Sequence, residues 1–247
     1  MAESITIAIP ARNEKENIES VVLDALRVGR QATDDLEVIV VDDHSTDGTY
    51  EILQALASQH HELRVIRHPA HRGIVGAFKT IYEETRKELL FMNASDRQWR
   101  MEELFPMREA LRQGPHDLVI ARRVEKRYTP FRKLVSACYR ISCETLFRVK
   151  VWDPGSIMMM REPIRRIPVM STGVFEPAER VIRAHAMGYR VTKVDVEHLP
   201  RTSGRATGAS WKNIRGAVRE LITFYIYYRR ELAPRLRESR KKTAPRD

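Results

Sequence analysis

Short apolar runs alternate with segments of helical periodicity through the first half of the chain. Runs rich in β-branched and other apolar residues predict strands at 5–10, 36–43, 63–68 and 88–93. Apolar positions recur at helical spacing in the segments between and after them, at 13–28, 45–59, 73–87 and 101–113. The run at 36–43 is typical of a strand buried on both faces. Strands that alternate with helices predict an α/β fold, with a mostly parallel sheet flanked by helices.

Polar clusters follow three of the predicted strands. They read PARNE after the first strand, DDHSTDG after the second and NASDRQ after the fourth. Ligands of open parallel sheets bind at the carboxyl ends of the strands, so we expect the three clusters to face one crevice. The chain has no G-x-G-x-x-G and no P-loop motif, which argues against a dinucleotide oxidoreductase and a P-loop phosphotransferase. Carboxylates without a glycine-rich cradle suit ribose hydroxyls and a Mg²⁺ or Mn²⁺ ion that holds a diphosphate, which predicts a nucleotide-sugar site.

Composition sets the scale of the molecule. The 247 residues are 43% hydrophobic and 31% charged, enough to bury a full core. We expect one domain over 1–230, with a nucleotide-sugar half at about 1–115, an acceptor half at about 116–230, and a basic tail at 231–247. The net charge of +10 suits phosphorylated ligands or an anionic membrane. A nucleic-acid partner is not expected, because the chain carries no recognition module for one.

Two further features concern location. No run reaches the roughly 20 apolar residues of a spanning helix, and the N-terminus does not read as a signal peptide, so we expect a cytoplasmic protein. Cys138 and Cys143 have no partner at metal-ligand spacing and are predicted to be buried thiols.

The segment 209–230 has an apolar helical face with basic residues around it. That pattern fits a helix on a membrane surface or a helix packed on the core equally well.

Four motifs in order, IAIPARNEKENI, VIVVDDHSTDGT, HRGIVGAFKT and LLFMNASDRQW, resemble those of the inverting GT-A glycosyltransferases of family 2. The later segments VIARR, FRKLVS, VFEPAERVIRAHAMGYRV and HLPRTSGR resemble the dolichol- or polyprenyl-phosphate sugar (mannose) synthase branch. The resemblance covers roughly 4–220. It implies a GT-A fold with a Rossmann-like nucleotide-binding half, a GDP-mannose or UDP-sugar donor, and a polyprenyl phosphate acceptor met by peripheral contact with the membrane.

The resemblance also assigns the donor site. It implies that the base and ribose pocket is lined by Pro10, Arg12 and Glu14, and that the nucleotide is met by Asp42 and Asp43. The sequence leaves open whether these two acids form a turn cluster before the helix instead. His71 either belongs to the turn before Gly73 or borders the base pocket.

The metal site departs from the family pattern. There the fourth strand ends in Asp-x-Asp followed two residues later by Gln, and these residues hold the metal and the donor diphosphate. Here Ala94 takes the place of the first acid, which leaves Asp96 and Gln98 as the implied metal ligands. Mg²⁺ keeps several waters and needs few protein ligands, so one carboxylate can suffice. The alternatives are a positive charge from Arg97, an oxygen from Asn93 or Ser95, or a site that binds without turnover.

The second half of the resemblance is rich in arginine. It implies that Arg123, Arg132 and Ser136 bind the acceptor phosphate, and that Arg201, in an Arg-x-x-Gly loop, closes over the donor. Asp96, Arg123 and Arg201 are therefore the catalytic candidates. Glu179 matches an acid that faces the crevice, or else pairs with a nearby arginine. A lipid phosphate is already anionic and needs no general base. The alternative functions are transfer to a soluble small molecule and nucleotide-sugar binding without catalysis.

Overall fold

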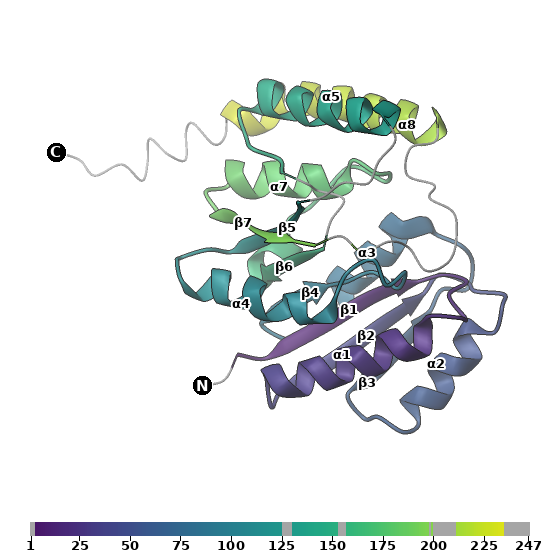
Figure 1. Cartoon of the computed structure of the whole chain (residues 1–247). Helices are drawn as coiled ribbons and strands as arrows, with labels where there is room; N and C mark the ends of the chain where they lie inside the picture. Colours follow the sequence, from purple (N-terminus) through teal and green to yellow (C-terminus); the bar gives the residue numbers. More distant parts are fainter. Residues whose placement is uncertain (1–2, 125–129, 153–156, 198, 200–210, 235–247) are drawn as a thin grey trace.

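The computed structural model describes residues 3–124, 130–152, 157–197, 199 and 211–234 (Figure 1). Within these ranges one seven-stranded sheet has the order β3-β2-β1-β4-β6-β5-β7. The strands are β1 (Ile5–Ala11), β2 (Leu36–Asp42), β3 (Leu63–Arg67), β4 (Leu89–Met92), β5 (Leu118–Arg123), β6 (Met158–Arg161) and β7 (Val191–Val196). The strand β6 runs antiparallel to β4 and β5, and the other pairs are parallel. The predicted mostly parallel α/β fold is confirmed.

Helices cover both faces of the sheet. They are α1 (Ile18–Ala32), α2 (Thr49–Ala57), α3 (Gly73–Glu84), α4 (Leu104–Arg112), α5 (Pro130–Phe147), α6 (Glu162–Arg165), α7 (Glu176–Ala186) and α8 (Trp211–Tyr227), with short turns η1 (Met101–Glu103) and η2 (Tyr228–Leu232). Side chains of α1, α2 and α4 form one core cluster, and those of α3, α5, α7 and α8 form the other. Alternate residues of β1 point to opposite clusters, since Ile7 joins the first and Ala8 the second.

The strand register brings the predicted polar clusters to one edge of the sheet. Ala11, the last residue of β1, lies beside Asp42, the last residue of β2. The amide of Asn93, just after β4, donates to the carbonyl of Ala8 at 3.0 Å. Because β5 runs antiparallel to β6 and β6 antiparallel to β4, Arg123 at the end of β5 comes out at the same edge.

Two helices begin later than the sequence predicts. The helix expected from residue 13 starts at Ile18, and the one expected from residue 45 starts at Thr49. The residues before each start belong instead to loops whose polar groups bond to one another across the two segments. Local propensity carries no information about such partners, which lie more than 30 residues apart.

The C-terminal part adds a layer over α7, made of α5 and α8 (Figure 1). The two helices lie side by side along their length, because Phe131 and Trp211 meet near their starts, with ring centroids 5.9 Å apart, and Phe147 and Phe224 meet near their ends at 5.3 Å. Glu220 of α8 accepts hydrogen bonds from the amides of Thr172 and Gly173, both at 2.8 Å, which ties α8 to the loop before α7. Of the described helices, none is long and apolar enough to cross a membrane.

The cysteines are both free, and the prediction for one of them was wrong. Cys143 is fully buried, as expected. Cys138 is exposed, because it lies on the outward side of α5, opposite the side that carries Cys143 and Phe147.

Candidate functional site

The loops after β1 and β2 are joined by hydrogen bonds between backbone and side chains. The amide of Asn13 donates to Ser45 Oγ at 2.9 Å, and the amide of Thr46 donates to Asn13 Oδ1 at 2.9 Å. The amide of Glu14 donates to Thr49 Oγ1 at 2.9 Å. Asn13 has a φ of 53°, a left-handed conformation that asparagine tolerates better than most residues. The two loops therefore form one wall, which carries the predicted donor residues Arg12 and Glu14, and Pro10 lies just before it, as the last residue but one of β1 (Ile5–Ala11).

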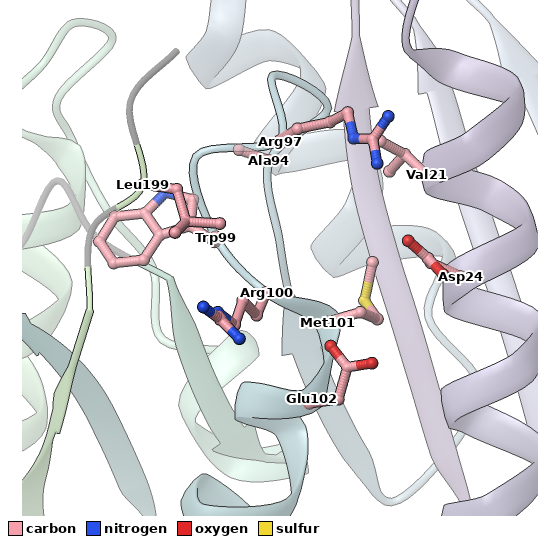
Figure 2. Close-up of a pocket in the computed structure, with 9 residues that line it drawn as sticks. All are labelled: Val21, Asp24, Ala94, Arg97, Trp99, Arg100, Met101, Glu102 and Leu199. Atoms are coloured by element: carbon pink, nitrogen blue, oxygen red, sulfur yellow. The ribbon is translucent and has the colours of Figure 1, made fainter. Parts of the chain in front are cut away.

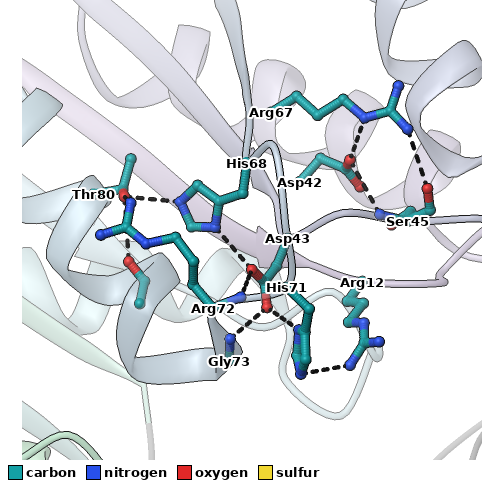
Figure 3. Close-up of polar contacts among 11 residues, drawn as sticks. Arg12, Asp42, Asp43, Ser45, Arg67, His68, His71, Arg72, Gly73 and Thr80 are labelled. Atoms are coloured by element: carbon teal, nitrogen blue, oxygen red, sulfur yellow. Dashed lines mark hydrogen bonds and ion pairs between the residues drawn. The ribbon is translucent and has the colours of Figure 1, made fainter.

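Asp43 is saturated by hydrogen bonds from the segment that starts α3 (Figure 3). Its Oδ1 accepts from His68 Nδ1 at 2.8 Å and from the amide of Arg72 at 2.7 Å. Its Oδ2 accepts from His71 Nδ1 at 2.7 Å and from the amide of Gly73 at 2.8 Å. Burial alone would raise the pKa of Asp43, but these donors outweigh it, and the pKa lies below its ordinary value. The carboxylate thus fixes the amino end of α3, where unpaired amides favour an anion.

His71 connects this carboxylate to the predicted base pocket. Its Nδ1 lies against Asp43, so that nitrogen carries the proton, and its Nε2 accepts from Arg12 Nη1 at 2.7 Å (Figure 3). The chain Asp43–His71–Arg12 holds an exposed guanidinium at the mouth of the site. The sequence left open whether His71 belongs to the turn before Gly73 or borders the base pocket. In the structure it contacts Asp43 and Arg12, and its place beside a bound base remains a prediction.

Asp42 differs from Asp43 in the number of hydrogen bonds that its carboxylate accepts. It is fully buried, and its Oδ2 lies 3.5 Å from Arg67 Nε and 3.3 Å from the amide of Ser45. Its Oδ1 has no hydrogen-bond partner among the described residues. A buried carboxylate oxygen without a donor is costly. Oδ1 is closed to solvent, so a ligand could reach it only if the groups around it moved.

The loop after β4 carries Asp96. The side chain is half-buried, and its Oδ1 accepts from the amide of Gln98 at 3.2 Å. Arg97 between them has a φ of 56°. The carbonyl of Gln98 accepts from the amide of Leu199 at 3.0 Å, so the segment after β7 lies along this loop.

Arg123 reaches the same loop from the end of β5. Its guanidinium carbon lies 5.2 Å from the ring centroid of Trp99, a cation–π distance. The structure thus places Arg123, a candidate for the acceptor phosphate, against the loop that carries the predicted metal ligands Asp96 and Gln98.

A small pocket of about 140 Å³ lies between α1 and the loop after β4 (Figure 2). Its lining comes from Val21 and Asp24 of α1, from Leu199, and from a stretch of the loop and η1, namely Ala94, Arg97, Trp99, Arg100, Met101 and Glu102. Asp96 and Gln98 are not part of the lining. The pocket therefore borders the candidate site and does not coincide with it.

The loop after β4 offers few protein ligands for a divalent cation. Among the described residues no group of three His, Cys, Asp or Glu side chains could hold a metal ion. Asp96 offers a carboxylate and Gln98 an amide oxygen, and Ala94 offers neither. Such a donor set fits Mg²⁺ or Mn²⁺ only when a diphosphate supplies further oxygens.

The acceptor candidates occupy the second half of the chain. Arg132 and Ser136 lie one turn apart on α5 and are half-buried. Glu179 of α7 is fully buried, accepts from Ser171 Oγ at 2.6 Å and from Arg183 Nε at 2.7 Å, and also receives the amides of Met170 and Ser171. Its pairing with an arginine is confirmed. Arg201 and Gly204 lie outside the described residues.

Solved structures share the fold. Glucosyl-3-phosphoglycerate synthase from Mycobacterium tuberculosis, in complex with Mn²⁺, uridine diphosphate and phosphoglyceric acid, superposes with a TM-score of 0.73 over 90% of this chain and 78% of that one, at 18% identity. A mannosyltransferase from Pyrobaculum calidifontis, in complex with GDP-Man and Mn²⁺, superposes with a TM-score of 0.63 over 92% of this chain and 65% of that one, at 22% identity. At these identities the likeness establishes the fold, which is GT-A.

Sequence relatives are glycosyltransferases. An uncharacterized glycosyltransferase of Mycobacterium tuberculosis is 26% identical over 234 residues, 90% of this chain and 97% of the relative. The undecaprenyl-phosphate 4-deoxy-4-formamido-L-arabinose transferase of Photorhabdus laumondii is 26% identical over 82% of this chain and 62% of the relative. The dolichol-phosphate mannosyltransferase of Pyrococcus furiosus is 30% identical over 53% of this chain and 38% of the relative.

The glycosyl transferase family 2 model matches residues 6–166, which include β1 to β5 and the Asp42, Asp43 and Asp96 loops. The chain belongs to glycosyl transferase family 2.

Proposed function

We propose that this glycosyltransferase moves a hexose, with inversion, from a nucleotide sugar to a polyprenyl phosphate. In the reaction an oxygen of the lipid phosphate bonds to the anomeric carbon while the bond from that carbon to the diphosphate breaks. The nucleoside diphosphate leaves from the opposite face. The donor is GDP-mannose or a UDP-hexose.

The donor nucleotide lies on the wall formed by the loops after β1 and β2. Asp42, the last residue of β2, borders the base or ribose from beneath this wall. Arg12, held by His71, covers the nucleotide from the rim. Asp43 contributes by fixing the start of α3 and by orienting His71.

The leaving diphosphate lies over the loop after β4. Asp96 and Gln98 are the residues that would hold Mg²⁺ or Mn²⁺, which when bound neutralises the charge that develops on the leaving group. Arg123, fixed over Trp99, adds a permanent positive charge on the same side. Arg201 is proposed to close over the donor.

One observation carries the choice of acceptor. Glu179, the acid that could have served as a base on this side, is fully buried and taken up by Arg183 and the loop at 170–171. A sugar hydroxyl needs a base to lose its proton, whereas a phosphate monoester is ionised at neutral pH. Arg132 and Ser136 suit a phosphate group, and positioning then replaces proton transfer.

A soluble phosphorylated acceptor is the second candidate. The M. tuberculosis structure that shares the fold contains phosphoglyceric acid, a soluble phosphate ester. Such an acceptor also carries a hydroxyl group, so the two candidates share the chemistry of attack only where the phosphate is the nucleophile.

The test is a screen of radiolabelled GDP- and UDP-sugars with mixed polyprenyl phosphates, with Mn²⁺ or EDTA added. The wild type is compared with Asp96→Asn and with Asp34→Asn, an exposed acid that precedes β2 at the far edge of the sheet. We expect metal-dependent label in the organic phase, lost in Asp96→Asn and kept in Asp34→Asn. A new labelled product in the aqueous phase, formed only when phosphoglyceric acid replaces the polyprenyl phosphates, favours the soluble acceptor. Nucleotide binding without product from either acceptor contradicts a catalytic role.

A further inference from the structure

The helix α5 carries a stripe of exposed residues on its outward side. Its members recur at three- and four-residue spacing, at Phe131, Leu134, Cys138, Ile141 and Thr145. Leu134 is 62% exposed and Ile141 is 56% exposed. The inward side of the same helix carries Cys143 and Phe147, so packing on the core does not account for the outward stripe.

The helix α8 carries a second exposed stripe of the same kind. It consists of Trp211, Val218, Ile222 and Ile226, again at helical spacing. Trp211 is 71% exposed and Ile222 is 53% exposed. Ala217 and Phe224 lie on the opposite, buried side.

The two stripes form one surface, which we call the α5–α8 face. They meet where the exposed rings of Phe131 and Trp211 contact each other, and the helices run side by side from there (Figure 1). Glu220 holds α8 to the body of the protein, so the face has a fixed position relative to the site. Exposed apolar side chains that lie together on one side of a protein mark an interaction site.

The residues beside the α5–α8 face are mostly basic, which favours an anionic partner. Exposed basic residues flank the stripes and follow both helices, namely Lys133, Arg140, Arg148, Lys150, Arg215, Arg219, Arg229 and Arg230. Within 130–150 and 211–234 the one exposed acid is Glu231. A second copy of the chain would bring these cations against one another, whereas an anionic lipid surface takes up the cations and the apolar side chains together.

We propose that the α5–α8 face docks this glycosyltransferase on an anionic lipid surface, with the apolar side chains entering the interface and the basic residues on the headgroups. The inference names the partner surface for the proposed function and rests on it. Arg132 and Ser136 lie on α5 itself, on the side turned toward the protein. Docking therefore sets the two acceptor-phosphate residues at headgroup level, where a lipid presents its phosphate.

Cys138 provides a probe on the native protein. It is exposed on the α5 stripe, whereas Cys143 is fully buried and burial raises the pKa of its thiol to about 12, so a thiol reagent labels Cys138 selectively. The labelled protein carries a nitrobenzoxadiazole dye and is mixed with equimolar phosphatidylglycerol–phosphatidylcholine vesicles or with phosphatidylcholine vesicles. Neither set contains polyprenyl phosphate or nucleotide sugar, so the result does not depend on turnover.

We expect the dye to brighten and shift to the blue with the anionic vesicles, and much less with the neutral ones or at high salt. The double variant Leu134→Glu, Ile222→Glu should lower the fraction of protein that floats with anionic vesicles by about tenfold or more. Each substitution puts a negative charge where an apolar side chain is proposed to enter the lipid interface. Leu23→Glu, on the exposed side of α1 and 42% exposed, is the matched control and should float like the wild type.

Three results overturn the proposal. They are no dye response with anionic vesicles, an equal loss of flotation in Leu23→Glu, or a dimer in solution that the double variant Leu134→Glu, Ile222→Glu dissociates.

The test of docking is independent of the test of the reaction. Vesicle binding with no lipid-linked product supports the docking face and contradicts the proposed acceptor, whereas product formation without vesicle binding does the reverse.

Discussion

At the scale of single residues, neighbouring carboxylates have different tasks. Asp42 and Asp43 are adjacent in sequence, and the family resemblance assigns both to the nucleotide. In the structure Asp43 has both oxygens engaged by His68, His71 and two amides, while Asp42 keeps one buried oxygen without a partner among the described residues. The contact of Asp43 with the nucleotide remains a prediction, and its contact with the start of α3 is observed.

Asp43→Asn should lower the free energy of unfolding by about 3 kcal/mol. One carboxylate oxygen would be replaced by an NH₂ group, which would face two N–H groups that now donate to that oxygen. Urea unfolding followed by circular dichroism measures the change. Asp34→Asn, at an exposed position, should stay within about 0.5 kcal/mol of the wild type. Equal midpoints for Asp43→Asn and the wild type would show that the Asp43 network adds nothing to stability.

Glu179→Gln separates a positioning acid from a general base. Loss of a general base costs about 10²- to 10⁴-fold in rate, but here we expect kcat to fall by less than about tenfold and the slope of kcat against pH to stay unchanged. Thermal stability should drop, because the charge partner of Arg183 is lost. A rate loss beyond a hundredfold with a new pH slope would sink the argument for an ionised acceptor.

At the scale of elements, the sequence predicted the strands well and their partners poorly. The four parallel strands β1 to β4 and the helices between them follow from apolar runs and helical spacing, whereas β5 and β7 were not predicted as strands. The strand β6 was missed, because its sequence MMMR has no β-branched residue and no alternation. The bonds from Asp43 to His68 and His71 span 25 and 28 residues and depend on which strands become neighbours, which no local pattern reveals.

The joined loops predict a particular kinetic effect. His71→Phe keeps a ring but removes both hydrogen bonds, the one to Asp43 and the one from Arg12. We expect KM for the nucleotide sugar to rise by about three- to tenfold with kcat within twofold, since the contact belongs to donor binding and not to the reacting atoms. Steady-state kinetics on donor concentration measures it. A fall in kcat at constant KM would move Arg12 and His71 into the reaction itself.

At the scale of the whole molecule, loops at the carboxyl edge of the sheet are joined to a layer of two helices, α5 and α8, whose outward side we propose to face lipid. The metal and arginine roles came from the family resemblance, and the structure places Arg123 over Trp99, in the loop that also carries Asp96 and Gln98. The α5–α8 face could not be read from the sequence, which left the last helix divided between core and membrane. Packing on the core is confirmed for the buried side of α8, and membrane contact of its exposed side remains a prediction.

Paired acids at several points predict how the fold responds to acid. Hydrogen bonds from Arg30 lower the pKa of Glu62 to about 2, and the pKa of Asp43 and of Asp47 is also lowered. A carboxyl group whose pKa is lower in the folded state contributes stability at neutral pH, and this is lost as pH falls through its folded value. The melting temperature should therefore hold near neutrality and fall between about pH 4 and pH 2, with a shallower fall in Glu62→Gln. A melting temperature independent of pH in that window would contradict the assignment.

In the proposed reaction a lipid phosphate oxygen attacks the anomeric carbon directly. The most direct measurement is the structure of the organic-phase product, by mass spectrometry and by nuclear magnetic resonance of the anomeric centre. Direct attack predicts a hexose bonded through one phosphate to the polyprenol, with an anomeric configuration opposite to that of the donor. A product with the donor's configuration, or a sugar attached through a hydroxyl group of the acceptor, would contradict it.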